Sequence, residues 1–351
     1  MSVATATFDL KNSTIVRFNK SRTYRALAHA FALAERHAPG AAAYVAERLW
    51  FRIPHAQGKR PEWLPGGRRV TLDLHGRRVL AEHWGTGPRV YLVHGWGGYR
   101  SQLAMFVPLL LESGYSVIAF DALGHGESDA GPMGAGQGSI LDFVASLKAA
   151  IAHFGPAHAI VAHSFGSTAT AKALREGLAV ERLVFIAPMA DPQRYMDGFV
   201  RLLGGGERIR ARLQQRIERR VGLGVETLQV AQLAREFTRP LLVFHDRDDR
   251  ETSWEDGADI VWAWPQARLV TTVRLGHRRI LSSPGVVREA VRFIREGQPA
   301  AAAPRILPER SARPKVRAAR PPRWAVGAAM HFALVLALSG YTLSLHDALP
   351  I

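Results

Sequence analysis

The chain has 351 residues, 47% of them hydrophobic, and it contains no cysteine. This length allows a sizeable core, and the lack of cysteine excludes disulfides, thiolate metal sites and cysteine nucleophiles. The formal net charge of +16 raises nucleic acid and anionic membranes as partner classes. We expect neither, because much of the excess lies in an Ala/Pro/Arg-rich segment (residues 297–340) and on one predicted helix (residues 208–220), without interleaved aromatic residues.

The N-terminal part is predicted to be a helical arm. Met1 to Lys20 carries charges throughout and has no apolar core, so it does not look like a secretory signal, and we expect a cytoplasmic protein. From Tyr24 to Phe51 the sequence is Ala-rich with apolar residues at helical spacing, broken at Pro39-Gly40. Residues 1–68 therefore form an expected N-terminal helical arm followed by a Pro/Gly-rich connector.

Short apolar strands alternate with helices along most of the remaining chain. Strands are predicted over residues 70–74, 78–84, 89–93, 116–120, 158–161, 182–186, 241–244 and 267–273, and helices over residues 102–111, 142–154, 166–174, 254–264 and 286–294. The first two strands read as a hairpin around His75-Gly76. The alternation predicts an α/β fold with a mostly parallel sheet, helices on both faces, and ligands bound at the carboxyl ends of the strands. Its core is expected over residues 69–190 and 240–296.

An insertion interrupts this alternation over residues 191–239. It is rich in Arg and Gln, helical in pattern, and broken at Gly204-Gly205-Gly206 and Gly222-Leu223-Gly224. An insertion at the ligand edge of a sheet is typical of a lid, so we expect a helical cap here; a peripheral helical decoration is the alternative.

One serine lies between a predicted strand and a predicted helix, in Ala162-His163-Ser164-Phe165-Gly166. The turn leaves no room for large side chains two residues before or after the serine, and both positions are small. Ser164 also lies at a helix N-terminus, where free backbone N–H groups favour developing negative charge. An ordinary N-capped helix is the alternative interpretation.

A serine nucleophile needs a base and a carboxylate that orients the base. His277 follows the strand over 267–273, and three aspartates follow the strand over 241–244, namely Asp246, Asp248 and Asp249. The glycine-rich turn His94-Gly95-Trp96-Gly97-Gly98 follows the strand over 89–93 and brings backbone N–H groups to the same edge. We assign the N–H groups of Trp96 and Phe165 to an oxyanion hole.

In these motifs the chain resembles the α/β-hydrolases. The similar segments are the oxyanion loop (residues 94–98), the D-x-x-G-H-G-x-S loop (121–128), the nucleophile elbow (162–166), the acid turn (245–249, usually H-G-x-x-D) and the histidine turn Gly276-His277. The resemblance covers about Val70 to Ile294. It implies a serine hydrolase that cleaves a carboxylic ester or related acyl compound with no cofactor or metal, in which Ser164 attacks, His277 transfers the proton and Asp249 orients the imidazole.

The acid turn departs from the family pattern, because Asp246 stands where glycine is usual. Alignment on the turn favours Asp249 as the acid, with Asp248, Asp246 and, after the preceding strand, Asp191 as alternatives. The fold also serves thioester, amide, lactone, carbon–carbon and acyl-transfer chemistry, so these activities and a non-catalytic binding protein stay open.

Other parts of the chain carry weaker expectations. A substrate pocket is assigned to His94, Trp96, His163 and Phe165, although ordinary packing would place these side chains similarly. Ala325 to Leu338 is apolar but short for a membrane span. Tyr341 to Ile351 reads as the translation of a common DNA-sequencing adapter and is not expected to belong to the natural protein.

Overall fold

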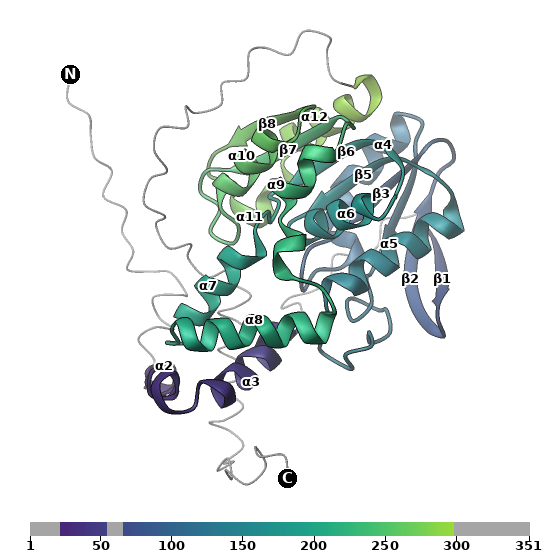
Figure 1. The fold of residues 1–351 in the computed structure, drawn as a ribbon. Helices are drawn as coiled ribbons and strands as arrows, with labels where there is room; N and C mark the ends of the chain where they lie inside the picture. Colours follow the sequence, from purple (N-terminus) through teal and green to yellow (C-terminus); the bar gives the residue numbers. More distant parts are fainter. Residues whose placement is uncertain (1–21, 55–65, 298–351) are drawn as a thin grey trace, which may run out of the picture. The chain divides into compact units, whose positions relative to one another are not determined.

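The computed structural model describes residues 22–54 and 66–297, which divide into two compact units (Figure 1). The smaller unit contains residues 22–50 and 196–217, and the larger unit contains the rest. Within the two described ranges, no helix has the length and apolar character needed to cross a membrane. The predicted tail from residue 298 on, including Ala325–Leu338 and Tyr341–Ile351, lies outside the described residues.

The larger unit is built on an eight-stranded sheet with the strand order β1-β2-β4-β3-β5-β6-β7-β8. The strands are β1 (Arg68–Leu74), β2 (Arg77–Trp84), β3 (Arg89–Val93), β4 (Ser116–Phe120), β5 (Ala157–His163), β6 (Val180–Ile186), β7 (Leu241–Asp246) and β8 (Ala267–Thr272). β2 pairs antiparallel with β1 and β4, and all other neighbours are parallel. The prediction of a mostly parallel α/β sheet is confirmed.

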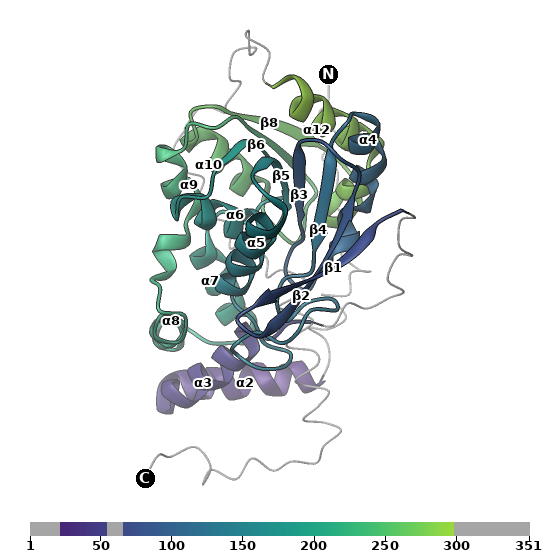
Figure 2. The same cartoon turned by 90° about the vertical axis from the view of Figure 1, so that its right-hand side faces the viewer.

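Helices cover both faces of this sheet. They include α4 (Val107–Glu112), α5 (Ile140–Phe154), α6 (Phe165–Arg175), α9 (Val230–Leu233), α10 (Trp254–Ala263), α11 (Gly276–Arg279) and α12 (Pro284–Glu296). Side chains alternate along each strand, so Tyr91 and Ile160 join the core beneath α5, α6 and α10, while Val90 and Val161 join the core beneath α4 and α12. Figure 2 shows α4 and α12 on one side of the sheet and α5 and α6 on the other. Burial on both faces explains why the parallel strands are continuous apolar runs.

One predicted helix is wrong in its detail. Residues 102–111 were expected to form one helix, but a 3₁₀ helix, η2 (Arg100–Phe106), precedes α4. Pro108 lies in the first turn of α4 and has no backbone N–H to donate to a carbonyl of the preceding turn. Leu103, in η2, has non-helical dihedral angles. The apolar spacing therefore continues across a break that the proline imposes.

The smaller unit joins the N-terminal helices to part of the 191–239 insertion. Its elements are α2 (Arg22–His37), α3 (Pro39–Trp50), most of α7 (Pro192–Leu202) and most of α8 (Glu207–Val221). The Glu35 carboxylate accepts N–H bonds from Gly206, Arg208 and Ile209 at 2.9, 2.8 and 3.1 Å and so caps the N-terminus of α8. Glu47 pairs with Arg216 at 2.5 Å.

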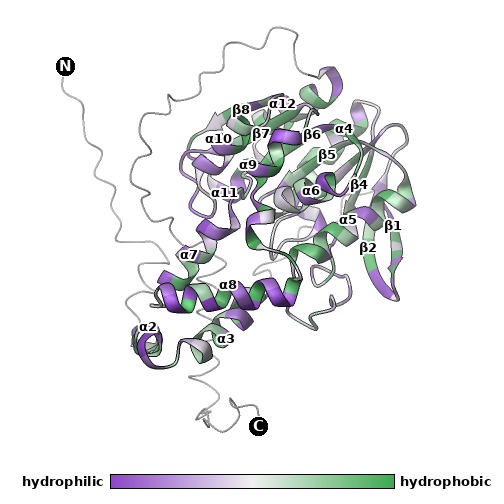
Figure 3. Ribbon diagram, viewed as in Figure 1, coloured by the Kyte–Doolittle hydropathy of each residue, from purple (hydrophilic) through white to green (hydrophobic). Residues whose placement is uncertain are grey.

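α8 is amphipathic. Its buried residues are Ile209, Leu213 and Ile217, at a spacing of four, which repeats one helical face. Figure 3 shows the resulting alternation of hydrophobic and hydrophilic colour along the helix. The arginines that dominate its composition thus lie mostly on the faces away from those three residues. The assignment of residues 191–239 to a lid stays a prediction.

Candidate active site

Ser164 lies in the sharp turn between β5 and α6. Its backbone has φ 53° and ψ −122°, a left-handed conformation that side chains other than glycine rarely adopt. The turn is held because the Ser164 N–H donates to the Ile186 carbonyl and the Ser164 carbonyl accepts from Ser167, each at 3.0 Å. Strain kept in place by surrounding bonds is typical of functional positions. The half-buried Ser164 side chain is thereby presented at the carboxyl end of the parallel strands.

The residue two positions after the serine, Gly166, has no room for a side chain. A Cβ built on Gly166 would meet the backbone carbonyl of His94 and lie 3.0 Å from that of Val93. The first turn of α6 therefore packs directly against the end of β3, with no space for a methyl group. Ala162, on the other side of the serine, is fully buried.

Gly166→Ala is expected to destabilise the fold by about 1–3 kcal/mol, because the clash is with backbone that cannot rotate away. Urea unfolding followed by circular dichroism measures the change in free energy. Gly285→Ala in α12 is the matched control, since the added Cβ would find its nearest neighbour at 3.9 Å. It should be neutral or stabilising, and equal effects of the two substitutions would contradict the steric explanation.

Ser164, His277 and Asp249 form a hydrogen-bonded row. His277 Nε2 lies 3.0 Å from Ser164 Oγ, and His277 Nδ1 lies 2.8 Å from Asp249 Oδ2. An ionised carboxylate only accepts hydrogen bonds, so Nδ1 carries the proton and Nε2 is left to accept the serine hydroxyl. Asp249 Oδ1 accepts N–H bonds from Glu251 and Thr252 at 2.7 and 3.0 Å, which fixes the carboxylate. The structure thus brings together the three residues assigned from sequence.

Electrostatics keep this row in the charge state that general-base chemistry uses. Burial raises the pKa of Asp249, but His277 and His245 lower it by more, so the pKa lies below its ordinary value. Burial lowers the pKa of His277, but the adjoining Asp249 carboxylate raises it by more, so the pKa lies above its ordinary value. Asp249 consequently stays ionised beside a histidine that is readily protonated.

The alternative acids all have other partners. Asp246 Oδ2 accepts from the Thr272 hydroxyl at 2.7 Å and from the Leu275 N–H at 3.0 Å. Asp248 Oδ2 accepts the Arg274 N–H at 2.9 Å. A separate alternative, Asp191, accepts N–H bonds at the start of α7, from the Gln193 backbone and the Gln229 side chain. Among these four aspartates, the structure places only Asp249 against His277.

The glycine-rich loop approaches Ser164 closely. Gly98 N–H donates to the Gly95 carbonyl at 3.0 Å, closing a tight turn, and a Cβ on Gly95 would lie 3.0 Å from the Ser164 Cβ. Trp96 lies in this turn and is anchored by its Nε1–H, which donates to the Arg52 carbonyl at 3.2 Å. Phe165 is the first residue of α6, where a backbone N–H has no acceptor within the helix. Both assigned oxyanion donors therefore belong to segments next to the serine.

The four residues assigned to a substrate pocket differ in exposure. Trp96 and Phe165 are half-buried, and their ring centroids lie 5.3 Å apart in an edge-on arrangement. His94 is fully buried; its Nδ1–H donates to the Gly95 carbonyl and its Nε2 accepts the Ala122 N–H, while burial lowers its pKa to about 4. His163 is 4% exposed and donates from Nε2 to the His277 carbonyl at 3.0 Å. The two histidines thus brace loops in this structure, and the pocket assignment stays a prediction.

Two contributors to the site have no sequence motif of their own. Thr252 Oγ1 lies 3.1 Å from both Asp249 Oδ2 and His277 Nδ1, beside the bond that joins them. The buried Arg100 pairs with Asp121, a residue of the D-x-x-G-H-G-x-S loop, and bonds it through its backbone N–H at 2.6 Å. Arg100 thereby ties the segment after the glycine-rich turn to that loop. In the sequence, Arg100 is only a lone arginine two residues before the predicted helix over residues 102–111.

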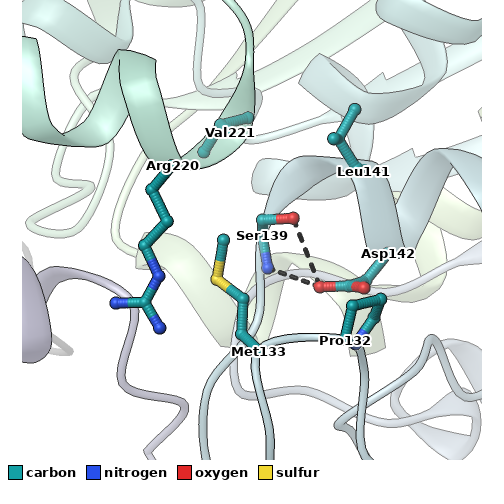
Figure 4. A pocket seen from close by; sticks show the side chains of 7 residues that line it. All are labelled: Pro132, Met133, Ser139, Leu141, Asp142, Arg220 and Val221. Atoms are coloured by element: carbon teal, nitrogen blue, oxygen red, sulfur yellow. Dashed lines mark hydrogen bonds between the residues drawn. The ribbon is translucent and has the colours of Figure 1, made fainter.

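A pocket of about 340 Å³ lies apart from these residues (Figure 4). It is lined by Pro132, Met133, Ser139, Leu141, Asp142, Arg220 and Val221. The Asp142 carboxylate is already bonded to the Ser139 N–H at 2.6 Å, as a capping box at the start of α5.

In the part of the chain that the structure describes, no group of three or more His, Asp or Glu side chains is arranged to hold a metal ion.

Comparison with known proteins agrees with the fold. Residues 88–203 match the family described as alpha/beta hydrolase fold. A non-heme haloperoxidase of Rhodococcus erythropolis is 31% identical over 99 residues, which are 28% of this chain and 35% of that protein. The match thus spans about a third of that curated relative.

Solved structures align over a larger part of the chain. An esterase from Exiguobacterium antarcticum aligns with a TM-score of 0.52 at 16% identity, covering 64% of this chain and 98% of that one. A bromoperoxidase from Bacillus anthracis aligns with a TM-score of 0.50 at 17% identity, covering 65% and 99%. At such identities the likeness concerns the fold. Together with the family match over residues 88–203, it shows that this chain has the α/β-hydrolase fold.

Proposed function

We propose that the protein is a serine hydrolase that cleaves a carboxylic ester or a related acyl compound through an acyl-enzyme. The observation that carries this proposal is the row Ser164, His277 and Asp249, joined at 3.0 and 2.8 Å. A serine hydroxyl is a weak nucleophile at neutral pH, and a neutral imidazole within hydrogen-bond reach is the group that activates it. The strained elbow and the adjoining glycine-rich loop support the same chemistry.

Acylation begins when Ser164 Oγ attacks the substrate carbonyl and its proton passes to His277 Nε2. The Asp249 carboxylate stabilises the imidazolium, and the N–H groups of Trp96 and Phe165 donate to the oxyanion. The tetrahedral intermediate then collapses, and His277 gives its proton to the departing alkoxide. An alcohol leaves, and the acyl group stays on Ser164.

Deacylation repeats these steps with water. His277 Nε2 takes a proton from a water molecule whose oxygen attacks the acyl carbonyl, and the same N–H groups hold the second oxyanion. Collapse releases the carboxylic acid and returns the proton to Ser164 Oγ. Every proton and electron pair comes from the chain, the substrate or water, so the proposal needs no cofactor or metal. Discharge to an acceptor other than water would make the same site an acyltransferase.

The assignments around this chemistry remain proposals. The 191–239 insertion is proposed as a lid, because it follows β6 at the carboxyl edge of the sheet, where the serine lies. An acyl small molecule is the proposed partner. Cytoplasmic location stays a prediction.

The proposal is tested with a fluorophosphonate probe and a series of nitrophenyl esters of increasing acyl length. We expect the probe to add to the peptide that contains Ser164, as located by mass spectrometry, and at least one ester to be turned over with a burst of nitrophenol. A folded protein that neither reacts with the probe nor hydrolyses any ester would instead be a binding protein on this fold.

The pH dependence of kcat/KM provides a separate prediction. Only the neutral form of His277 accepts the serine proton, and its pKa is raised above the ordinary value of 6.5 by Asp249 against the effect of burial. Activity should therefore be lost as pH falls through a value above 6.5 and be complete at higher pH. Asp249, whose pKa is lowered, stays ionised throughout.

Neighbouring charges give this prediction its controls. Glu251 raises the pKa of His277 and Arg278 lowers it. Glu251→Gln should thus move the acid limb to lower pH and Arg278→Gln to higher pH, while Arg288→Gln, on the exposed side of α12, should leave it in place. A wild-type limb at or below the ordinary histidine value would contradict the prediction.

A further inference from the structure

The turn that carries His277 is held by two carboxylates of the acid turn that do not touch the imidazole. Asp248 Oδ2 accepts the Arg274 N–H at 2.9 Å. Asp246 Oδ2 accepts the next N–H along the chain, that of Leu275, at 3.0 Å, and also the Thr272 hydroxyl at 2.7 Å. Two consecutive backbone donors between β8 and α11 are thus bonded to the last residue of β7 and to the turn that follows it.

This turn needs external support. Arg274 has φ 63°, a left-handed conformation that is unfavourable for a residue with a side chain. Gly276 also has positive φ, and the helix that begins there, α11, has only four residues. So short a helix is marginal by itself. The conformation therefore persists because bonds from outside the turn hold it.

The Asp246 carboxylate is suited to that task. It is fully buried, and its second oxygen, Oδ1, accepts the Asp248 N–H at 2.9 Å, which also orders the acid turn. Burial raises the pKa of Asp246, but the Thr272 hydroxyl and the N–H groups of Gly276, Leu275 and Asp248 lower it by more. The carboxylate is thus ionised, and bonds from N–H groups to an ionised carboxylate are stronger than those to a neutral acceptor.

We propose that Asp246 and Asp248 are positioning residues, and that their bonds to the turn, here called the carboxylate clasp, hold His277 between Ser164 and Asp249. The clasp acts on the backbone one to three residues before the imidazole. His163 bonds the His277 carbonyl from β5, so the histidine is fixed on both sides. The catalytic effect of the clasp rests on the proposed function, whereas its effect on the backbone does not.

Loss of the clasp should affect turnover more than substrate binding. The bond from His277 Nε2 to Ser164 Oγ is 3.0 Å long, and a displacement of about 1 Å would break it. The groups assigned to hold the acyl carbonyl, Trp96 and Phe165, come from other segments. We therefore expect kcat to fall while KM stays nearly unchanged.

The kinetic experiment compares Asp246→Ala, Asp246→Asn and Asp248→Ala with the wild type on a nitrophenyl ester. Asp246→Ala should lower kcat by about 10- to 100-fold with KM within about twofold. Asn keeps an oxygen that accepts N–H bonds, so Asp246→Asn should recover most of the loss. Asp73→Ala is the matched control, because Asp73 Oδ1 likewise accepts a turn N–H, that of Gly76 at 3.1 Å, in the β1–β2 hairpin. It should keep wild-type kcat.

A measurement independent of activity follows the backbone directly. Hydrogen–deuterium exchange of the peptide spanning residues 273–279 should be faster in both alanine variants than in the wild type, and close to wild type in Asp246→Asn and Asp73→Ala. Asp248 is exposed, so Asp248→Ala is expected to fold even where Asp246→Ala does not. If the wild type neither hydrolyses esters nor reacts at Ser164, the proposed function fails while the exchange data still test the clasp.

The proposal has clear contrary results. Wild-type kcat and wild-type exchange in Asp248→Ala, and in Asp246→Ala where that variant folds, would overturn it. A loss of kcat in Asp246→Asn as large as in Asp246→Ala would also overturn it, because the bonds rather than the charge are proposed to act. So would unchanged exchange in variants that had lost activity.

Discussion

Replacement of Ser164 by alanine is expected to lower kcat for ester hydrolysis by about 10,000-fold or more, because no acyl-enzyme can form without the hydroxyl. The alanine side chain fits the elbow, since it keeps the Ser164 Cβ that lies close to Gly95 and adds no atom. Substrate binding should survive, so KM and the affinity for a product acid should change little. Initial rates at saturating nitrophenyl ester measure the loss, and intact-protein mass spectrometry should show no fluorophosphonate adduct.

Ser167→Ala is the matched control for this substitution. Ser167 lies three residues further on, in α6, and its buried hydroxyl donates to the Ala162 carbonyl at 3.1 Å. Losing that bond should cost about 1 kcal/mol of stability and leave turnover within about tenfold of wild type. Substantial hydrolysis by a purified Ser164→Ala protein would show that the chemistry does not use this serine.

Asp249→Asn is expected to lower kcat by about 10,000-fold, through the tautomer of His277. The Asp249 Oδ1 atom accepts two backbone N–H bonds, from Glu251 and Thr252, and an asparagine would keep its oxygen there. Its amide NH₂ would then face His277 Nδ1, which would have to accept a bond. The imidazole proton would move to Nε2, leaving no base toward Ser164.

Asp248→Asn is the control, because it removes one negative charge from the same turn. An asparagine oxygen can still accept the Arg274 N–H, so the loss of kcat should stay below about tenfold. Circular dichroism melting should show both variants folded. If Asp249→Asn kept wild-type kcat, the acid would have to be sought among Asp248, Asp246 and Asp191.

The sheet could be predicted from sequence because burial on both faces makes its strands apolar runs. β3 and β4 were predicted at their observed bounds, and the other strands to within a few residues. The glycine and small-residue turns located Ser164 because backbone contact demands small side chains there. The break before α4 was missed, since apolar spacing is insensitive to one proline.

In the acid turn, the sequence could not establish which aspartate contacts the histidine. Three aspartates within four positions look alike in sequence, and alignment alone ranked them. In the structure the chain turns between them, so their carboxylates point to different partners: Asp249 to the imidazole, Asp246 and Asp248 to successive backbone amides. Such divergence depends on backbone direction at single residues, which periodicity does not encode.

Contacts between residues far apart in the chain could not be predicted from the sequence either. His163, at the end of β5, and Thr252, between β7 and α10, both bond His277 but share no sequence pattern. Arg100 bonds Asp121 from a different segment. The pairing of the N-terminal helices with the insertion, through Glu35 and through Glu47 with Arg216, joins segments about 170 residues apart. The sequence of each segment predicts a helix, but no local pattern indicates which other segment that helix contacts.

The cap that Glu35 places on α8 limits how this chain can be recombined with its relatives. A chimera that transplants residues 191–239 as one continuous block would leave the N-terminus of α8 without its carboxylate and Arg216 without Glu47. The transferable unit is therefore discontinuous: residues 22–50 and the insertion have to move, and change, together.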